Sequence, residues 1–153
     1  MAGDGRGADE VETAIEVELA RLQRGLDAVR RRDDLLDRAA YAILDRIEAG
    51  DTSASALATA LHLDQSTIAR QVAAAEAKAL LVRSPASGRG RGQLLALTPK
   101  GRRELDRARQ DRIRRIHATL AAWDDAERAE LARVLAHLND AIVHRLDTRP
   151  TEA

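Results

Sequence analysis

Apolar residues at helical spacing near both ends of the chain predict long amphipathic helices. From 11 to 31 they recur in alternating steps of four and three, a spacing typical of a helix that packs on another helix. The members of this stripe are Ile15, Leu19, Leu22, Leu26 and Val29. Similar patterns predict helices at about 35–49, which Gly50 ends, at 99–120, and from Asp124 to about 147.

Between these long helices the pattern becomes shorter and changes its period. Ala54 to Leu63 predicts a small helix, and Asp64 begins a second one, DQSTIARQVAAAEAKALL, with its apolar positions on one side. Two strands are expected at 81–83 and 93–97, on either side of a loop at 85–92. This order of elements predicts a mainly α fold with a small β-hairpin wing, a winged helix-turn-helix between terminal helices.

Polar residues crowd the first two turns of the second short helix, where a recognition helix meets the base edges of DNA. They are Gln65, Ser66, Thr67, Arg70 and Gln71. Arg70 can bind guanine through two hydrogen bonds, and Gln71 or Gln65 can bind adenine in the same way. Ser66 and Thr67 are better suited to holding phosphate. We therefore expect this helix to enter the major groove.

The hairpin that follows is basic and rich in glycine. Its loop, PASGRGRG, places Arg89 and Arg91 between glycines, which let a backbone approach the minor groove, where negative potential favours an inserted arginine. From Arg83 to Arg103 the chain has six basic residues and no acidic one, although the whole protein has a net charge of zero. This segregated charge favours a face that binds double-stranded DNA, with Arg83 on a phosphate.

These segments resemble the MarR (multiple antibiotic resistance regulator) family of transcriptional regulators. The matching pieces are LATALHLDQSTIARQVAAAEAKALLVR and RGQLLALTPKGRREL, in the order and at the spacing of that family. The resemblance implies a homodimer that binds a pseudo-palindromic operator, usually represses, and often releases DNA when a small-molecule effector binds. Two-fold symmetry would place the two recognition helices in successive major grooves.

The chain departs from the family pattern in the wing and in the recognition helix. Arg89 stands where the family has an acidic residue, and Arg91 stands at the family's arginine. Arg91 is therefore the predicted wing tip, with Arg89 able to share or take that role. The recognition helix has Ala75 where the family prefers leucine and Ala79 where it prefers glycine, which predicts a lighter core and a different exit from the helix.

The amino-acid composition narrows the kinds of core, reactive site and cellular location that this protein can have. The chain has 153 residues with no phenylalanine, one tryptophan and one tyrosine, so an aliphatic core between closely packed helices is expected. It has no cysteine, which excludes disulfides, thiolate zinc sites and cysteine-based oxidant sensing. No apolar stretch approaches the ~20 residues of a membrane span, and the N-terminal residues do not look like a signal peptide. We therefore expect a cytoplasmic protein without a membrane partner.

Chemistry other than DNA binding has little support. The histidines are His62, His117, His137 and His144, and the seven-residue spacing of the last two is not that of a metal clip. No nucleophile–base motif, phosphate loop or cofactor fingerprint is present, so neither an enzyme, a metal site nor a cofactor is expected. Two alternatives stay open: a non-specific architectural nucleic-acid binder, and a helical protein-interaction module. Arg70 could also be a solvated residue paired near Glu76, and Gln65 could equally be a plain surface residue.

The expected organisation has three kinds of segment. Loose tails are expected at 1–9 and 148–153. Residues 10–34 and 99–147 would form a helical dimerisation region, because their apolar stripes are longer than a small head can cover. Residues 35–98 would form the winged helix-turn-helix that reads DNA.

Overall fold

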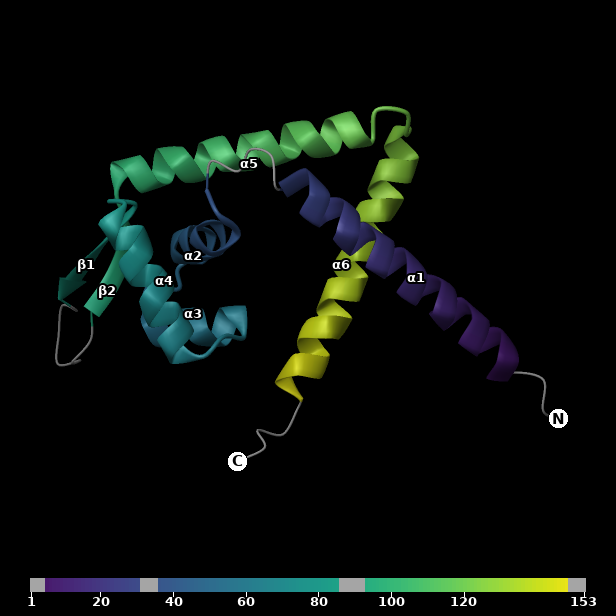
Figure 1. Ribbon diagram of the computed structural model, residues 1–153, viewed down its shortest axis with the longest axis horizontal. Coiled ribbons are helices and arrows are strands. Elements are labelled where there is room, and N and C mark those ends of the chain that lie inside the picture. Colours follow the sequence, from purple (N-terminus) through teal and green to yellow (C-terminus); the bar gives the residue numbers. More distant parts are fainter. Residues whose placement is uncertain (1–4, 31–35, 86–92, 149–153) are drawn as a thin grey trace. The chain divides into compact units, whose positions relative to one another are not determined.

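A computed structural model describes residues 5–30, 36–85 and 93–148 (Figure 1). Within these residues the chain forms six helices and one two-stranded sheet, which confirms the predicted fold class. The elements are α1 (Gly5–Arg30), α2 (Arg38–Glu48), α3 (Ala54–Leu61), α4 (Gln65–Ala77), β1 (Leu81–Pro85), β2 (Gln93–Leu97), α5 (Pro99–Thr119) and α6 (Asp125–Asp147). The chain divides into two compact units, Met1–Leu35 and Leu36–Ala153.

The first unit consists of α1, which begins earlier than the sequence predicted. Its first residue is Gly5, so residues 5–9 are helical rather than part of a loose tail. Ala8, Glu10 and Glu12 are good helix formers, which favours a helix over these residues, although the first turn of α1 contains no acidic residue. Ile15, Leu19, Leu22 and Leu26 of the predicted apolar stripe are 44–51 % exposed in this chain. The grouping of residues 10–34 and 99–147 as a dimerisation region stays a prediction.

Five helices of the second unit begin at a side chain that caps them. In each case an oxygen of the residue before the helix accepts the backbone N–H three residues on, which satisfies one of the free donors of the first turn. The capping residues are Asp37, Ser53, Asp64, Thr98 and Asp124. The last four stand where the sequence predicted a helix to begin, whereas Asp37 moves the start of α2 to Arg38 from the expected position near 35.

The core of the second unit lies around α2. Its buried side chains are aliphatic throughout, in agreement with the composition. They are Leu36, Ala40, Ile43, Leu44, Ile47, Leu57, Ile68, Val72, Ala75, Leu80, Leu81, Leu95, Leu105 and Ala108. Helix α2 packs on α3, α4, α5 and β2, and we call α2–α4 with the hairpin the head. This packing holds α4 as a rigid element for whatever its exposed side binds.

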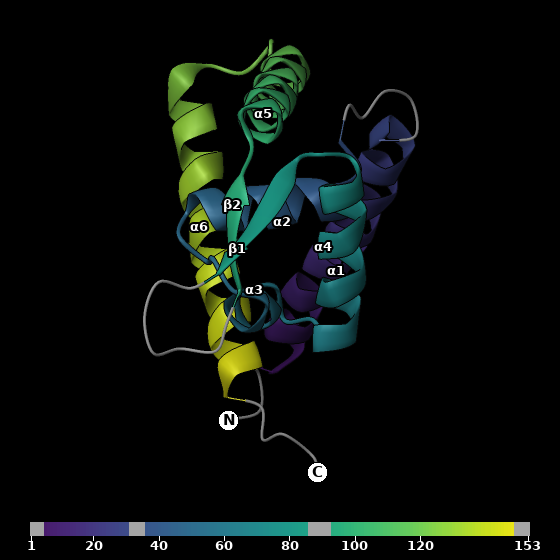
Figure 2. The same ribbon diagram turned by 90° about the vertical axis from the view of Figure 1, so that its left-hand side faces the viewer.

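The hairpin pairs β1 with β2 in antiparallel fashion (Figure 2). Leu81 lies opposite Leu97, and Arg83 lies opposite Leu95. Leu81 and Leu95 are buried in the core, and the backbone N–H of Leu95 also donates to the carbonyl of Thr52 at 2.7 Å. The free edge of β2 is thereby attached to the segment between α2 and α3. The strands are fixed to the head at their base, and residues 86–92 between them lie outside the described residues.

Helix α4 ends four residues before the predicted limit. Its last residue is Ala77, and Ala79 has a φ of 55°, the left-handed region that a continuing helix cannot use. The sequence pattern continued through this point because alanine is an excellent helix former. This backbone conformation is one that favours glycine, the residue that the resembling family prefers here, and this chain adopts it with an alanine.

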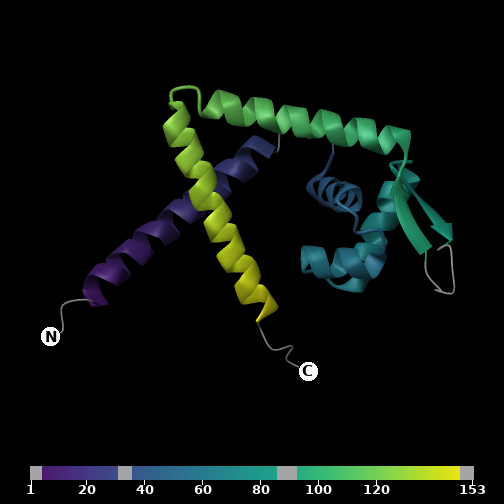
Figure 3. The same cartoon turned by 180° about the vertical axis from the view of Figure 1, so that it is seen from behind.

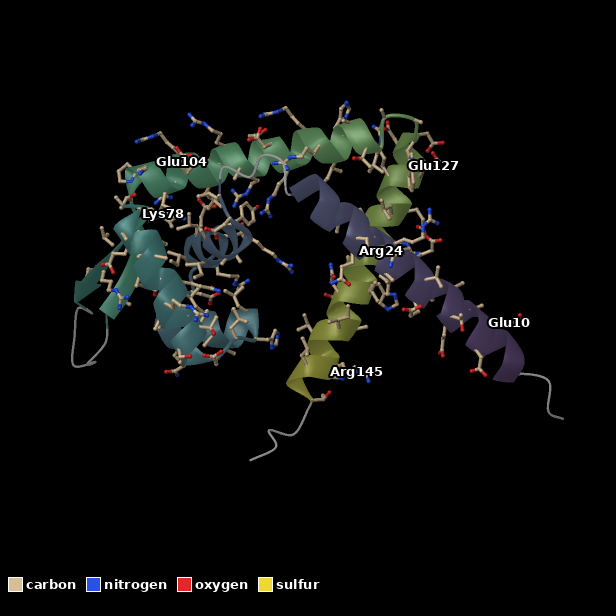
Figure 4. All side chains as sticks on the ribbon, viewed as in Figure 1. Glu10, Arg24, Lys78, Glu104, Glu127 and Arg145 are labelled. Carbon is tan, nitrogen blue, oxygen red and sulfur yellow. The ribbon has the colours of Figure 1, made fainter. Side chains whose placement is uncertain are left out.

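The start of α5 is tied to the end of α4. The hydroxyl of Thr98 donates to the carbonyl of Ala79 at 2.8 Å, and the Lys100 ammonium donates to the carbonyl of Lys78 at 2.8 Å. Figure 4 shows Lys78 at the end of α4 that meets α5. These bonds join the end of α4 to the first turn of α5.

Farther along α5, Arg109 connects that helix to α2. Its Nη2 atom lies 2.9 Å from Asp45 Oδ1 and 2.9 Å from Glu48 Oε2. The carboxylates of Asp45 and Glu48 raise the pKa of Arg109 above its ordinary range. The guanidinium of Arg112 covers the ring of Tyr41 at 3.4 Å from its centroid. Figure 3 shows α5 passing over α2 and continuing to the tight turn that leads into α6.

Candidate nucleic-acid interface

The recognition helix α4 is held by its apolar side and presents its polar side. Ile68, Val72 and Ala75 are buried against the head. Gln65, Ser66 and Arg70 are exposed, and Thr67 and Gln71 are half-buried. The five predicted DNA-contact residues of this helix therefore all lie on its first two turns, and three of them are exposed to solvent.

The turn between α3 and α4 is tight because His62 adopts a left-handed conformation. Its φ is 50°, and the next backbone N–H, that of Leu63, donates to the carbonyl of Ala58 at 3.0 Å. His62 thus serves as the cap at the end of α3. This reverses the chain within a few residues and sets the angle between α3 and α4.

Asp64 binds three groups at the start of α4. Its Oδ1 accepts from the Thr67 backbone N–H at 2.8 Å and from the Ser66 hydroxyl at 2.5 Å, and its Oδ2 accepts from the Thr67 hydroxyl at 2.7 Å. The hydroxyls of Ser66 and Thr67 and this N–H hold the pKa of Asp64 well below its usual range. The sequence predicted Ser66 and Thr67 as phosphate contacts, but here both hydroxyl protons are donated within the protein.

Arg70 and Gln71 differ in how they present their polar atoms. Arg70 is exposed and has no hydrogen bond or ion pair with any described residue. The Oε1 atom of Gln71 is buried and lacks a hydrogen-bond partner within the described ranges. In this conformation Gln71 does not offer both amide groups outward, as a two-bond contact with adenine requires. Gln65 is exposed and meets that requirement better.

Arg83 on β1 is paired with an acidic residue of the recognition helix. Its Nε atom lies 2.9 Å from Glu76 Oε2, and both side chains are partly exposed. Glu76 is therefore engaged with Arg83 and not with Arg70, which was the alternative for that arginine. Arg89 and Arg91, the two predicted wing arginines, lie outside the described residues.

The positive charge between 83 and 103 is partly offset by acids from other segments. Besides the Glu76–Arg83 pair, Arg102 Nη1 lies 4.0 Å from Glu48 Oε1. Sequence counting treated this stretch as uniformly positive because its acidic partners are outside it. The same reasoning missed Asp64 as the residue that fixes Ser66 and Thr67, although the spacing Asp-x-Ser-Thr at a helix start is a recognisable signal.

Metal binding and membrane insertion have no support in the described part of the chain. No group of three or more histidine, aspartate or glutamate side chains lies close enough there to hold a metal ion. No helix in the same residues is long and apolar enough to cross a membrane.

Comparison with known proteins gives the context for this head. No family model matches the sequence. The chain is 33 % identical over 133 residues to YxaD of Bacillus subtilis strain 168, an uncharacterised helix-turn-helix-type transcriptional regulator, covering 84 % of this chain and 93 % of that protein.

Solved structures share the fold along most of the chain. A MarR family protein from Bacillus stearothermophilus matches with a TM-score of 0.70 at 21 % identity, over 92 % of this chain and 99 % of that one. The PcaV transcriptional regulator of Streptomyces coelicolor, solved with its natural ligand, matches with a TM-score of 0.65 at 25 % identity, over 81 % of this chain and 90 % of that one. With a shared fold and a relative of this identity and coverage, the chain belongs to the MarR family of DNA-binding transcriptional regulators.

Proposed function

We propose that this protein is a homodimeric repressor that binds an inverted-repeat operator and is released from it by a small molecule. The observation that carries the proposal is the recognition helix, whose exposed Gln65, Ser66 and Arg70 stand on a helix packed firmly into the head. A rigid element presenting donors and acceptors is what base readout in the major groove requires.

Exposed apolar side chains on the terminal helices support the dimer. Residues of α6 that would be buried in a larger assembly are 38–48 % exposed in the single chain. They are Val134, Leu135, Ile142, Val143 and Leu146. Ile113 and Ile116 on α5 are also exposed, as are Ile15, Leu19, Leu22 and Leu26 on α1. A second copy of the chain offers the same stripes, and mutual burial would remove this apolar area from water.

The DNA contacts follow from the positions of the polar side chains. Arg70 and Gln65 would read base edges in the major groove, and Arg83 would lie near a phosphate. Arg91, with Arg89 beside it, would enter the minor groove from the wing. Gln71 would join the major-groove contacts only after its amide turns outward.

Ligand control is supported by what is known of structural neighbours. PcaV was solved with its natural ligand, and the DNA binding of Bordetella bronchiseptica BpsR is regulated by 6-hydroxynicotinic acid. A ligand that favours one spacing of the two heads would weaken operator binding by its differential affinity for that state. The protein would act in the cytoplasm, where its operator is, and it would act as a regulator rather than as an enzyme.

The decisive experiment measures binding of the purified protein to DNA flanking its own gene and to a scrambled duplex at physiological salt. A preference of about 10³-fold or more with a footprint over an inverted repeat is expected. Arg70→Ala should lower operator affinity about tenfold or more. Arg107→Ala, an exposed arginine of α5, should leave it unchanged. Sedimentation of the same sample should give twice the mass of one chain.

Two other results would contradict the proposal. Equal, weak and strongly salt-dependent binding to both duplexes would favour a non-specific architectural protein. Absence of binding to either duplex and to a random-sequence library would favour a protein-interaction module built on the exposed helical stripes.

A further inference from the structure

The directions of two hydrogen bonds at the start of α4 are fixed by chemistry. An ionised carboxylate has no proton and can only accept, so the contacts of Asp64 with the hydroxyls of Ser66 and Thr67 must be donated by the hydroxyls. The low pKa of Asp64 keeps it ionised throughout the neutral range. A hydroxyl has one proton, so both side chains have already used theirs.

What remains on each hydroxyl oxygen is accepting capacity. Phosphate oxygens of DNA are acceptors as well, so neither hydroxyl can bond a phosphate while it is held by Asp64. The negative charge of Asp64 beside them also disfavours a close phosphate. In the major groove, the base groups that can donate are the N6 amino group of adenine and the N4 amino group of cytosine.

We propose that Ser66 and Thr67 are specificity-determining residues that, held by Asp64, accept hydrogen bonds from amino groups of adenine or cytosine. This inference rests on the proposed function, because it assigns a role within sequence-specific binding. At a position read on its purine, adenine is selected over guanine, whose O6 is an acceptor at the corresponding place. At a position read on its pyrimidine, cytosine is selected over thymine for the same reason.

The test begins with selection of binding sites from a random duplex library by the wild-type protein. Each position of the enriched half-site is then changed, and relative affinities are measured for wild type, Ser66→Ala and Thr67→Val. Wild type should favour adenine over guanine, or cytosine over thymine, by about tenfold at the position under each hydroxyl. Each variant should lose this preference at one position and keep the preferences elsewhere.

Asp64→Asn gives a result that loss of a contact cannot imitate. The Thr67 backbone N–H holds the amide oxygen at the place of Oδ1, so the amide nitrogen takes the place of Oδ2 and donates to the Thr67 hydroxyl. That hydroxyl then has its proton available to an acceptor. The preference at the Thr67 position should reverse toward guanine or thymine, while asparagine preserves the helix cap.

Glu76→Gln is the matched control for the lost charge. It removes one carboxylate from the same helix, where Glu76 contacts Arg83, so it should alter affinity for all sequences without reversing any base preference.

Two outcomes overturn the inference, and they differ in what they say of the proposed function. In the first outcome, Ser66→Ala and Thr67→Val weaken binding to every duplex by one common factor and leave each base preference intact. The hydroxyls then do not contact bases, but the proposed function as a sequence-specific regulator is unaffected. If wild type enriches no motif from the library, sequence-specific binding itself is absent and the inference falls with it.

Discussion

A Cβ atom added to Gly101 would lie 1.8 Å from the carbonyl oxygen of Leu80, nearer than any real contact. The approach is close because the Thr98 N–H donates to the same carbonyl at 3.1 Å, which draws the first turn of α5 onto the end of α4. Both Gly101 and the Leu80 carbonyl belong to the backbone, which cannot move aside as a side chain can. A side chain at position 101 therefore requires the end of α4 and the start of α5 to move apart.

We predict that Gly101→Ala lowers the free energy of unfolding by about 1–3 kcal/mol, as expected for overpacking against backbone. Arg103→Ala, a change at an exposed residue two positions along the same helix, should stay within about 0.5 kcal/mol of wild type. Urea unfolding followed by circular dichroism measures both. Equal stability of the two variants would show that the junction tolerates a methyl group.

Ala79 has a left-handed backbone that costs an L-residue with a Cβ more than it costs glycine. Ala79→Gly is therefore expected to raise the free energy of unfolding by about 1 kcal/mol. Ala77→Gly, two residues earlier in the last turn of α4, should have the opposite sign and cost about 0.5–1 kcal/mol, because that residue is helical. Destabilisation of the protein by both substitutions would contradict the strain assigned to Ala79.

These examples show why the sequence predicted some features and not others. Caps such as Ser53, Thr98 and Asp124 are local, since side chain and accepted N–H are three residues apart, so the helix starts could be identified from short patterns. The contact of Gly101 with Leu80 joins residues 21 positions apart in the numbering, and no periodicity encodes it. The contact between Arg109 and Asp45 joins residues 64 positions apart and likewise cannot be predicted from local patterns.

The sequence pattern predicted where the polar residues of α4 lie, but not how their polar atoms are oriented. The pattern placed the polar residues correctly on the first turns of α4, because burial of Ile68 and Val72 fixes which side is exposed. The direction of a hydroxyl proton and the inward turn of the Gln71 oxygen depend on three-dimensional neighbours. The roles of Arg89 and Arg91 stay predictions.

The low pKa of Asp64 makes the stability of the head dependent on acid pH. Because the pKa in the folded state lies below its unfolded value of 3.8, the stabilising contribution is complete above that value. This contribution to stability is lost as the pH falls from 3.8 through the lowered pKa of Asp64 in the folded protein. The stability difference between wild type and Asp64→Asn should therefore be larger at neutral pH than at about pH 3.

Urea titrations at the two pH values measure this difference. The double variant Ser66→Ala, Thr67→Val keeps the carboxylate but removes both hydroxyl donors, so it should show a weaker acid dependence than wild type. A difference between wild type and Asp64→Asn that is the same at both pH values would mean that the hydroxyls do not stabilise the ionised form.

The Glu76–Arg83 pair should moderate the attraction between the head and DNA. Glu76 lies 2.9 Å from the Arg83 guanidinium at the junction of α4 and β1 and offsets its charge. Glu76→Gln removes that offset, so affinity for any duplex should rise about twofold to fivefold at low salt, and the slope of log K against log salt should steepen by up to about 1.

The control for this prediction is Glu130→Gln, which breaks a similar pair with Arg133 on α6, outside the head, and should change neither the affinity nor the slope. Fluorescence anisotropy over a salt series measures both variants. An unchanged slope for Glu76→Gln would place Arg83 away from the phosphates, and a fall in affinity would mean that Glu76 instead holds Arg83 in its binding position.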